Sequence, residues 1–261
     1  MKKYLVIGNP IKHSLSPKLH NHWIKENKIN AIYDKKLINE SDIGEIINEI
    51  KKDKISGINV TVPFKKSVIP FLDQLTSLAK EAQSVNTIYK KDNKIFGDNT
   101  DIGGFEQSLK HINYNVQNKR VFILGAGGVA SSIIVALKKL GVNKIILANR
   151  TKKKAEDLKK IFSDLEVLNW GENTNFDMII NTTSLGLKKS DIIKVDFDKV
   201  GSNKLFYDLI YNPSKTNFLF EGEKLGNKIS NGKMMFIYQA QLAFKIWHNV
   251  LPKINKNLLD Q

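Results

Sequence analysis

Apolar and polar residues alternate with two different periods along the first hundred positions. Short apolar runs at Lys3–Ile7, Ala31–Leu37 and Ile55–Val62 are typical of β-strands. Between them, Pro17–Asn27 and Ser41–Lys51 carry the spacing of amphipathic helices. This order of strands and helices predicts a mainly parallel sheet with helices on its faces.

Local signals mark where these helices begin. Ser16 precedes Pro17, and we expect the serine to cap the first helix with the proline at its first helical position. Ser41, with Glu45 nearby, marks the start of the second. A further helix and a hairpin complete this part of the chain, at Asp73–Gln83, Thr87–Tyr89 and Lys94–Phe96.

The alternation of strands and helices repeats beyond a polar stretch at Asn113–Lys119, which we interpret as a hinge region. The expected elements are Asp101–His111, Arg120–Leu124, Val129–Leu140, Lys144–Leu147, Lys152–Phe162, Leu165–Leu168, Met178–Asn181 and Leu205–Leu209. They predict one doubly wound unit. A last helix, Lys233–Asn249, is expected to return to the first part. The chain is therefore expected to form two α/β domains, 1–100 and 101–232, with residues 233–261 packing back on the first.

Composition supports this division and limits the partners. A length of 261 residues exceeds what one hydrophobic core usually supports, and the chain contains no cysteine for disulfides or thiolate chemistry. The net charge of +15 comes from dispersed lysines, which argues against nucleic-acid binding but favours anionic small molecules. The apolar run at the N-terminus is too short for a signal peptide or a membrane span, so a cytoplasmic location is the default expectation.

A glycine-rich motif follows the strand that ends at Leu124. It fits the pattern G-x-G-x-x-A and consists of Gly125, Ala126, Gly127, Gly128, Val129 and Ala130. The first glycine permits a tight turn, the second lets backbone amides approach a pyrophosphate, and the small alanine lets the helix pack closely on the strand. The motif predicts a dinucleotide site, although a glycine-rich turn without ligand remains the alternative.

The end of the next strand decides between dinucleotides. NAD sites carry an acid about 20 residues after the glycines, but Ala148–Lys154 contains none. Arg150 can clamp a 2′-phosphate with its planar fork, with Thr151 and the following lysines as further donors. This pattern favours NADP over NAD. The alternative is that Arg150 caps a helix or pairs with Glu156.

A second group of polar residues lies in the first domain. Asn59 and Thr61 alternate with apolar residues and share one face of a strand, and Lys65 follows just beyond its carboxyl end. Asp101 stands at a helix start after the predicted hairpin. Taken singly, the lysine is a surface charge and the aspartate a cap. Together they can serve exchange between a carbonyl and an alcohol, because the lysine is a positive donor for a developing alkoxide.

Ser14 and Ser16 offer two hydroxyls beside free amides at a helix N-terminus, which suits a substrate carboxylate. The alternative is that Ser16 only caps the helix. His20 and His22 are two residues apart and would not face each other on a helix. We therefore expect no metal site.

These segments together resemble the shikimate dehydrogenase family over almost the whole chain. The matching motifs, in order, are Ser14-Leu15-Ser16-Pro17, Asn59-Val60-Thr61-Val62-Pro63-Phe64-Lys65, Asn99-Thr100-Asp101, Gly125-Ala126-Gly127-Gly128, Asn149-Arg150-Thr151, Asn181-Thr182-Thr183-Ser184-Leu185-Gly186, Tyr211-Asn212-Pro213, Gly232-Lys233-Met234-Met235 and Gln239-Ala240. Any one of them would be weak evidence, but the ordered set is specific.

The resemblance implies an N-terminal substrate domain, a C-terminal Rossmann-like NADP-binding domain and a cleft that closes over substrate. It implies NADPH-dependent reduction of 3-dehydroshikimate to shikimate, with Lys65 and Asp101 as the catalytic pair. The implied substrate contacts are Ser14, Ser16, Asn59, Thr61, Asn86, Tyr211 and Gln239. The implied cofactor contacts beyond the glycine motif are Asn149, Arg150, Thr151, Lys154, Thr183, Gly232 and Met235.

Two departures from the family pattern concern the nicotinamide side, where Thr182 replaces an alanine of some members and Phe236-Ile237 a Leu-Val pair. Three other functions stay open at this point: a related dehydrogenase acting on quinate or an aminated analogue, a folate one-carbon oxidoreductase, and an NADPH-binding sensor without turnover. The serine pair and the Asn-Thr-Asp run are unexplained by the folate enzyme. Small molecules are the expected partners, with the chain as a monomer or homodimer.

Overall fold

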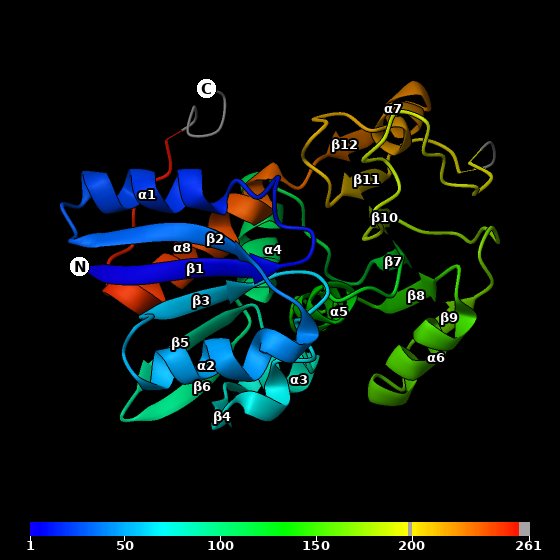
Figure 1. The fold of residues 1–261 in the computed structure, drawn as a ribbon. Helices are drawn as coiled ribbons and strands as arrows, with labels where there is room; N and C mark the ends of the chain where they lie inside the picture. Colours follow the sequence, from blue (N-terminus) through cyan, green and yellow to red (C-terminus); the bar gives the residue numbers. More distant parts are fainter. Residues whose placement is uncertain (198–199, 256–261) are drawn as a thin grey trace. The chain divides into compact units, whose positions relative to one another are not determined.

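The computed structural model describes residues 1–197 and 200–255, which form two compact units (Figure 1). The first unit comprises Met1–Phe105 and the C-terminal segment from Ile237, and the second comprises Glu106–Phe236. Each unit is built on one six-stranded sheet. The expected α/β fold class with two mostly parallel sheets is confirmed.

The first sheet has the strand order β2-β1-β3-β5-β6-β4. Its strands are β1 (Lys2–Gly8), β2 (Ala31–Leu37), β3 (Gly57–Val60), β4 (Gln74–Leu75), β5 (Thr87–Lys91) and β6 (Lys94–Asp98). Strand β1 pairs in parallel with β2 and β3, whereas the β5–β6 hairpin joins β3 antiparallel. The ends of β1 and β3, the beginning of β5 and the end of β6 consequently lie along one edge of this sheet.

Helices cover both faces of the first sheet. Successive residues of β1 point to opposite sides of the sheet, and those from Tyr4 to Ile7 are all buried, so both faces need a cover. They are α1 (Ser16–Glu26), α2 (Ile43–Lys51), α3 (Ser77–Ala82) and α8 (Lys233–His248). Leu5 and Ile7 of β1 belong to a core with the isoleucines of α2. Tyr4 on the other face packs against Trp247 and His248 of α8. Figure 1 shows α2 and α1 on opposite sides of β1.

Three local predictions in this unit were wrong. Ser16 is the first residue of α1 and makes no cap bond; Leu15 precedes it. The second helix is preceded by a 3₁₀ turn, η1 (Glu40–Asp42), which is closed by a reciprocal Asn39–Asp42 capping box rather than by Ser41. The predicted helix over 73–83 shortens to α3, preceded by β4, because the Asp73 carboxylate accepts a bond from the Ile95 amide and holds this segment beside β6.

The second sheet is fully parallel, with the order β12-β11-β10-β7-β8-β9. Its strands are β7 (Arg120–Leu124), β8 (Lys144–Ala148), β9 (Glu166–Leu168), β10 (Met178–Asn181), β11 (Leu205–Asp208) and β12 (Lys228–Ser230). Counted within the unit, the order is 3-2-1-4-5-6 of doubly wound nucleotide-binding folds. The order reverses between β7 and β10, where such folds bind ligands beyond the carboxyl ends of the strands.

The helices of this unit are α5 (Ala130–Lys139), α6 (Lys152–Ile161) and α7 (Asn217–Lys224), and α4 (Thr100–His111) leads into it from the first unit. The sequence analysis did not predict α7 or β12, which are short elements. Thr216 caps α7 by accepting a bond from the Leu219 amide. Across residues 1–197 and 200–255, no helix has both the length and the apolar character needed to cross a lipid bilayer.

Candidate active site

Lys65 and Asp101 meet at the edge of the first sheet where β3 and β6 end. Asp101 lies in the first turn of α4, just after β6. The backbone of Lys65 is held in place because its carbonyl oxygen accepts a hydrogen bond of 2.8 Å from the Val85 amide. Lys65 Nζ donates to Asp101 Oδ2 at 2.6 Å, and the side chains are only 10% and 8% exposed. The structure thus brings together the two predicted catalytic residues and shields both charges from bulk water.

Asn86 holds the other oxygen of this carboxylate. Its Nδ2 donates to Asp101 Oδ1 and to Thr100 Oγ1, both at 2.9 Å. It also lies 3.4 Å from Oε1 of Gln239 on α8. Asn86 Oδ1 accepts from the Thr100 amide at 2.8 Å and from Thr87 Oγ1 at 3.0 Å. The predicted residues Asn86 and Gln239 therefore join the catalytic pair in one hydrogen-bonded network.

Asn59 extends this network to α1. Its Nδ2 donates to the Asn86 carbonyl at 3.0 Å and to Thr87 Oγ1 at 3.1 Å. Its Oδ1 accepts from the hydroxyl of Tyr33 at 2.7 Å, and that hydroxyl is also hydrogen-bonded to the Ser16 side chain. Asn59 and Ser16 are buried. Two predicted substrate residues on different elements are therefore joined by a tyrosine that the sequence analysis did not single out.

The remaining predicted residues of this edge lie outside the network. Ser14 Oγ accepts from the Ser16 amide at 3.3 Å, so the two serines are joined through the backbone. Thr61 is half-buried above the end of β1, where a Cβ on Gly8 would come within 2.5 Å of Thr61 Cγ2. Only a glycine at position 8 lets the Thr61 side chain come this close to β1. A glycine at the end of a strand is the sequence signal that could have indicated this contact.

The glycine motif of the second unit lies at the switch point of its sheet. Gly125 has φ +109°, and a Cβ there would lie 2.7 Å from Thr182 Oγ1 and 2.8 Å from Thr183 Cγ2. Gly127 is exposed, and a Cβ there would meet no atom within 4 Å. Gly128 and Val129 are half-buried, and Ala130 is completely buried at the start of α5. The first glycine is required by the fold, whereas the second leaves open space in front of the helix N-terminus.

Asn149 links the motif to the end of β8. Its Oδ1 accepts from the Ala126 amide at 3.0 Å, and its Nδ2 donates to the Thr151 carbonyl at 2.8 Å. Arg150, Thr151 and Lys154 are exposed beside it at the start of α6. Among the described residues, no ion pair joins Arg150 to Glu156, so the guanidinium is not engaged in the pairing considered as an alternative.

A buried carboxylate organises the loops after β10 and β11. Asp208 accepts from Thr216 Oγ1 at 2.5 Å, from the Ile210 amide at 2.9 Å and from Asn181 Nδ2 at 3.0 Å. Burial raises the pKa of Asp208 to about 6, against the lowering effect of these bonds. Asn181 Oδ1 in turn accepts from the amide and hydroxyl of Thr183. Asp208, which the sequence analysis did not single out, therefore fixes the loop that carries Thr183.

The remaining predicted residues of this unit, Gly232 and Met235 on the nicotinamide side and Tyr211 for the substrate, follow β11 and β12. A Cβ on Gly232 would lie 2.0 Å from the Leu209 carbonyl oxygen, so only glycine fits between these loops. Met235 is buried, and Tyr211 is half-buried with its ring stacked on Phe236 at 4.9 Å. Thr183 thus follows β10 and Tyr211 follows β11, while Gly232 lies against Leu209 at the end of β11.

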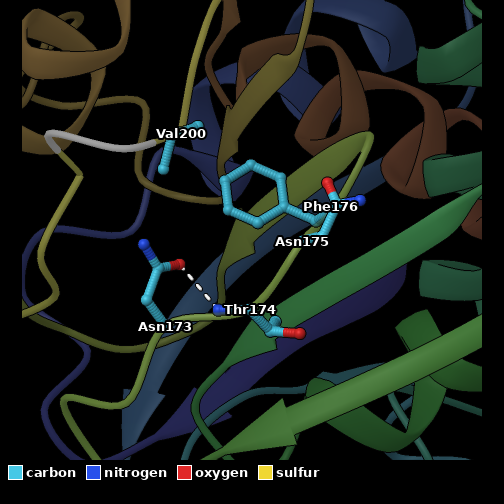
Figure 2. A pocket seen from close by; sticks show the side chains of 5 residues that line it. All are labelled: Asn173, Thr174, Asn175, Phe176 and Val200. Carbon is cyan, nitrogen blue, oxygen red and sulfur yellow. Dashed lines mark hydrogen bonds between the residues drawn. The ribbon is translucent and has the colours of Figure 1, made fainter.

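Two cavities lie away from the residues described above. A cavity of about 300 Å³ lies before the start of β10. Figure 2 shows the residues that line it, Asn173, Thr174, Asn175, Phe176 and Val200. It lies at the opposite end of β10 from the glycine motif and holds no charged side chain. A second, near the β5–β6 turn, is lined by Lys51, Asp73, Lys90, Asn93 and Lys94. No group of three or more histidines, aspartates and glutamates within 1–197 and 200–255 could hold a metal ion.

Comparisons with known proteins identify the family. The model of the shikimate dehydrogenase substrate binding domain matches residues 6–88, and that of shikimate / quinate 5-dehydrogenase matches residues 107–196. The NADP(+)-dependent shikimate dehydrogenase of Pelagibacter ubique is 60% identical over 262 residues, covering 99% of both chains. The two matched segments fall in the first and second units respectively.

Solved structures agree with this match. The crystal structure of shikimate dehydrogenase from Aquifex aeolicus superposes with a TM-score of 0.91 at 38% identity, covering 100% of this chain and 96% of that one. A shikimate dehydrogenase crystallised in complex with NADP+ also gives a TM-score of 0.91, at 34% identity, covering 97% and 92%. From two matching domain models and a full-length relative at 60% identity, it follows that this chain belongs to the shikimate dehydrogenase family.

Proposed function

We propose that the chain is an NADP-dependent oxidoreductase that interconverts shikimate and 3-dehydroshikimate, working as a reductase in aromatic amino acid biosynthesis. The observation that carries the proposal is the shielded Lys65–Asp101 pair, 2.6 Å apart at the edge of the first sheet. The names of the relatives support it, since the Pelagibacter ubique protein is a shikimate dehydrogenase (NADP(+)).

The second unit fits a dinucleotide with a 2′-phosphate. The open space in front of Gly127 admits a pyrophosphate at the N-terminus of α5, where amides and the helix dipole favour anions. Arg150 is exposed at the end of β8, where an NAD site would carry an acid. Asn149, Arg150, Thr151 and Lys154 would hold the adenosine phosphate. The whole motif from Gly125 to Ala130 would hold the pyrophosphate, with Thr183, Gly232 and Met235 on the nicotinamide side.

NADP(H), when bound, would provide the hydride transfer, and this chain's own residues would handle the proton. The Lys65 ammonium donates to the oxygen that changes between carbonyl and alcohol, which stabilises negative charge there and returns a proton to it on reduction. Asp101 orients the ammonium, because one carboxylate oxygen binds Lys65 and the other binds Asn86. The lysine can thus act without moving away from its partner.

The polar edge of the first sheet suits a hydroxylated carboxylate. Ser14 accepts from the Ser16 amide and keeps its own hydroxyl proton for a carboxylate oxygen. Thr61 is half-buried at the same edge and offers a second hydroxyl. Ser16, Asn59, Asn86, Gln239 and Tyr211 complete the proposed substrate set. With these residues, the first unit is proposed to bind the substrate and the second to bind NADP.

Initial rates with shikimate and quinate, each with NADP and NAD, test the proposal. We expect NADPH to form with shikimate at a specificity constant well above those of the other three combinations. A preference for quinate would reassign the substrate, because the matched family model names both acids. Cofactor binding without turnover of either acid would instead indicate a sensor. A monomer or homodimer and a cytoplasmic location stay predictions.

A further inference from the structure

We propose that Tyr33 is a positioning residue of the substrate site, whose hydroxyl helps to hold the side chains of Asn59 and Ser16 in place. The inference rests on the proposed function, because it concerns the residues assigned there to shikimate. Tyr33 lies in β2, the edge strand of the first sheet, and its side chain is only 2% exposed. Its hydroxyl donates to Asn59 rather than to Lys65 or Asp101, so we assign it no role in the chemical step.

The Tyr33 hydroxyl bridges two elements that carry substrate residues. It donates to Oδ1 of Asn59 on β3 at 2.7 Å, in a fully buried contact. It is also hydrogen-bonded to the side chain of Ser16 on α1. Through Asn59 this contact continues to the Asn86 carbonyl at 3.0 Å. One phenol therefore connects the start of α1 to the network that holds the Asp101 carboxylate.

The donors and acceptors in this chain can be assigned in one direction. Thr87 Oγ1 donates its proton to Asn86 Oδ1, so it accepts from Asn59, as does the Asn86 carbonyl. Both hydrogens of the Asn59 amide group are then used, and Asn59 Oδ1 must face Tyr33 as an acceptor. The Tyr33 proton goes to that oxygen. The lone pairs of the Tyr33 oxygen then remain for its contact with the Ser16 side chain.

The Tyr33 side chain stays protonated and is held in position by residues of α1. Burial raises the pKa of Tyr33 well above its ordinary value, so the hydroxyl remains a donor at working pH. The ring stacks on His20 at 4.2 Å with an interplanar angle of 4°. Asn21 binds both the Tyr33 amide, at 2.9 Å, and the Tyr33 carbonyl, at 2.7 Å. Since α1 carries His20, Asn21 and Ser16, the same helix that presents the serine also fixes the tyrosine.

These assignments give Ser14 and Ser16 different roles. The Ser16 side chain contacts the Tyr33 hydroxyl, whereas Ser14 accepts from the Ser16 amide and keeps its proton for a carboxylate oxygen. Without the Tyr33 hydroxyl, Asn59 Oδ1 would be buried without a donor, and only the bonds from Asn59 Nδ2 to the Asn86 carbonyl and to Thr87 Oγ1 would hold the side chain. Asn59 and Ser16 would then be held less firmly, although the ring would still fill its place in the core.

Tyr33→Phe tests this proposal, with Tyr4→Phe as the matched control. Tyr4 is another buried tyrosine of the same sheet, and its hydroxyl binds Ser56 beside the beginning of β3, at the opposite edge from Lys65. For both variants and the unaltered enzyme, we would measure shikimate binding by calorimetry, KM for shikimate and for NADP, kcat and thermal unfolding. Direct binding separates the positioning role from the proposed turnover.

We expect Tyr33→Phe to weaken shikimate binding and raise its KM about tenfold, with the NADP KM unchanged and kcat altered less. Tyr4→Phe should leave shikimate binding unchanged. If Tyr33→Phe binds shikimate as tightly as Tyr4→Phe, or if its NADP KM, kcat and stability change in step with shikimate binding, the positioning role is wrong. An unaltered enzyme that binds shikimate without oxidising it would refute the proposed function while leaving this comparison valid.

Discussion

Lys65 Nζ lies 2.6 Å from Asp101 Oδ2, although the two residues are 36 positions apart in the sequence. One follows β3 and the other follows β6, and both strands end at the same edge of the first sheet. Both side chains are about nine-tenths shielded from solvent. A charge pair in such a place costs desolvation, which the short Lys65–Asp101 contact and the bond from Asn86 to the second carboxylate oxygen offset.

The first prediction concerns this lysine. Lys65→Met keeps most of the aliphatic side chain and removes the ammonium, so kcat for shikimate oxidation should fall by about 10²–10⁴-fold while KM changes far less. Steady-state kinetics with saturating NADP measure both. Lys66→Met, at the exposed neighbouring position, is the matched control and should retain its turnover. A Lys65→Met enzyme with near-normal kcat would show that another group handles the proton.

The second prediction separates the two glycines of the motif. Gly125→Ala should destabilise the protein by about 1–3 kcal/mol, because an alanine at φ +109° is strained and its Cβ would lie 2.7 Å from Thr182 Oγ1. Gly127→Ala should leave the free energy of unfolding unchanged within about 0.5 kcal/mol. It should nevertheless weaken NADP binding about tenfold or more, because its Cβ enters the space assigned to the pyrophosphate.

Denaturant unfolding of the cofactor-free proteins and calorimetric titration with NADP distinguish these outcomes. If Gly127→Ala binds NADP normally, the pyrophosphate lies elsewhere. A Gly125→Ala protein as stable as the unaltered one would contradict the structural role of that turn.

The third prediction concerns cofactor choice. Arg120 and Arg150 are the only arginines in the chain, and Arg150 alone lies at the end of β8. Arg150→Ala should raise KM for NADP about 10- to 100-fold by removing charge-assisted bonds to the 2′-phosphate, with little effect on KM for NAD. Lys159→Ala removes one positive charge from the last turn of the same helix, α6, and should change neither value. Equal effects of Arg150→Ala on both cofactors would refute 2′-phosphate recognition.

The fourth prediction concerns Asp208. Because burial raises its pKa to about 6, the folded protein binds this proton more tightly than the unfolded chain, and the contribution to stability is lost as pH rises from about 4 to 6. The expected loss is about 3 kcal/mol. Asp208→Asn can keep the bonds to Asn181, Ile210 and Thr216 but cannot titrate. The variant should therefore lack this loss.

The measurement is the free energy of unfolding of both proteins at several pH values between 4 and 7. Only the difference between them isolates Asp208, because burial also lowers the pKa of His20 to about 3 and of His248 to about 4, and those groups act in the opposite direction. A difference that does not vary with pH would mean that Asp208 titrates near its ordinary value.

The sequence predicted the large elements well, for physical reasons. The buried strands β1, β7 and β10 are uninterrupted apolar runs, and the parallel pairing follows from the helices between them. The fold class, the family and the named relatives' cofactor dependence on NADP agree with the predictions. The helix expected over 73–83 failed because a tertiary contact, from Asp73 to the Ile95 amide, outweighs local propensity.

The site was predicted less completely. The position of Lys65 after a strand and of Asp101 at a helix start indicated these two residues, and the family resemblance implied Asn86; the structure joins the three side chains. Tyr33 and Asp208 gave no local signal, since their roles come from partners 26 and 27 positions away, Asn59 and Asn181. The assigned roles of the site residues stay predictions until variants are measured.

The most direct test of the central claim is the consumption of NADPH when 3-dehydroshikimate is added, with the product identified by chromatography. The account predicts that one equivalent of shikimate forms for each NADPH oxidised, and that the rate collapses in Lys65→Met but not in Lys66→Met. NADPH that stays unoxidised in the presence of 3-dehydroshikimate, or a product other than shikimate, would contradict it.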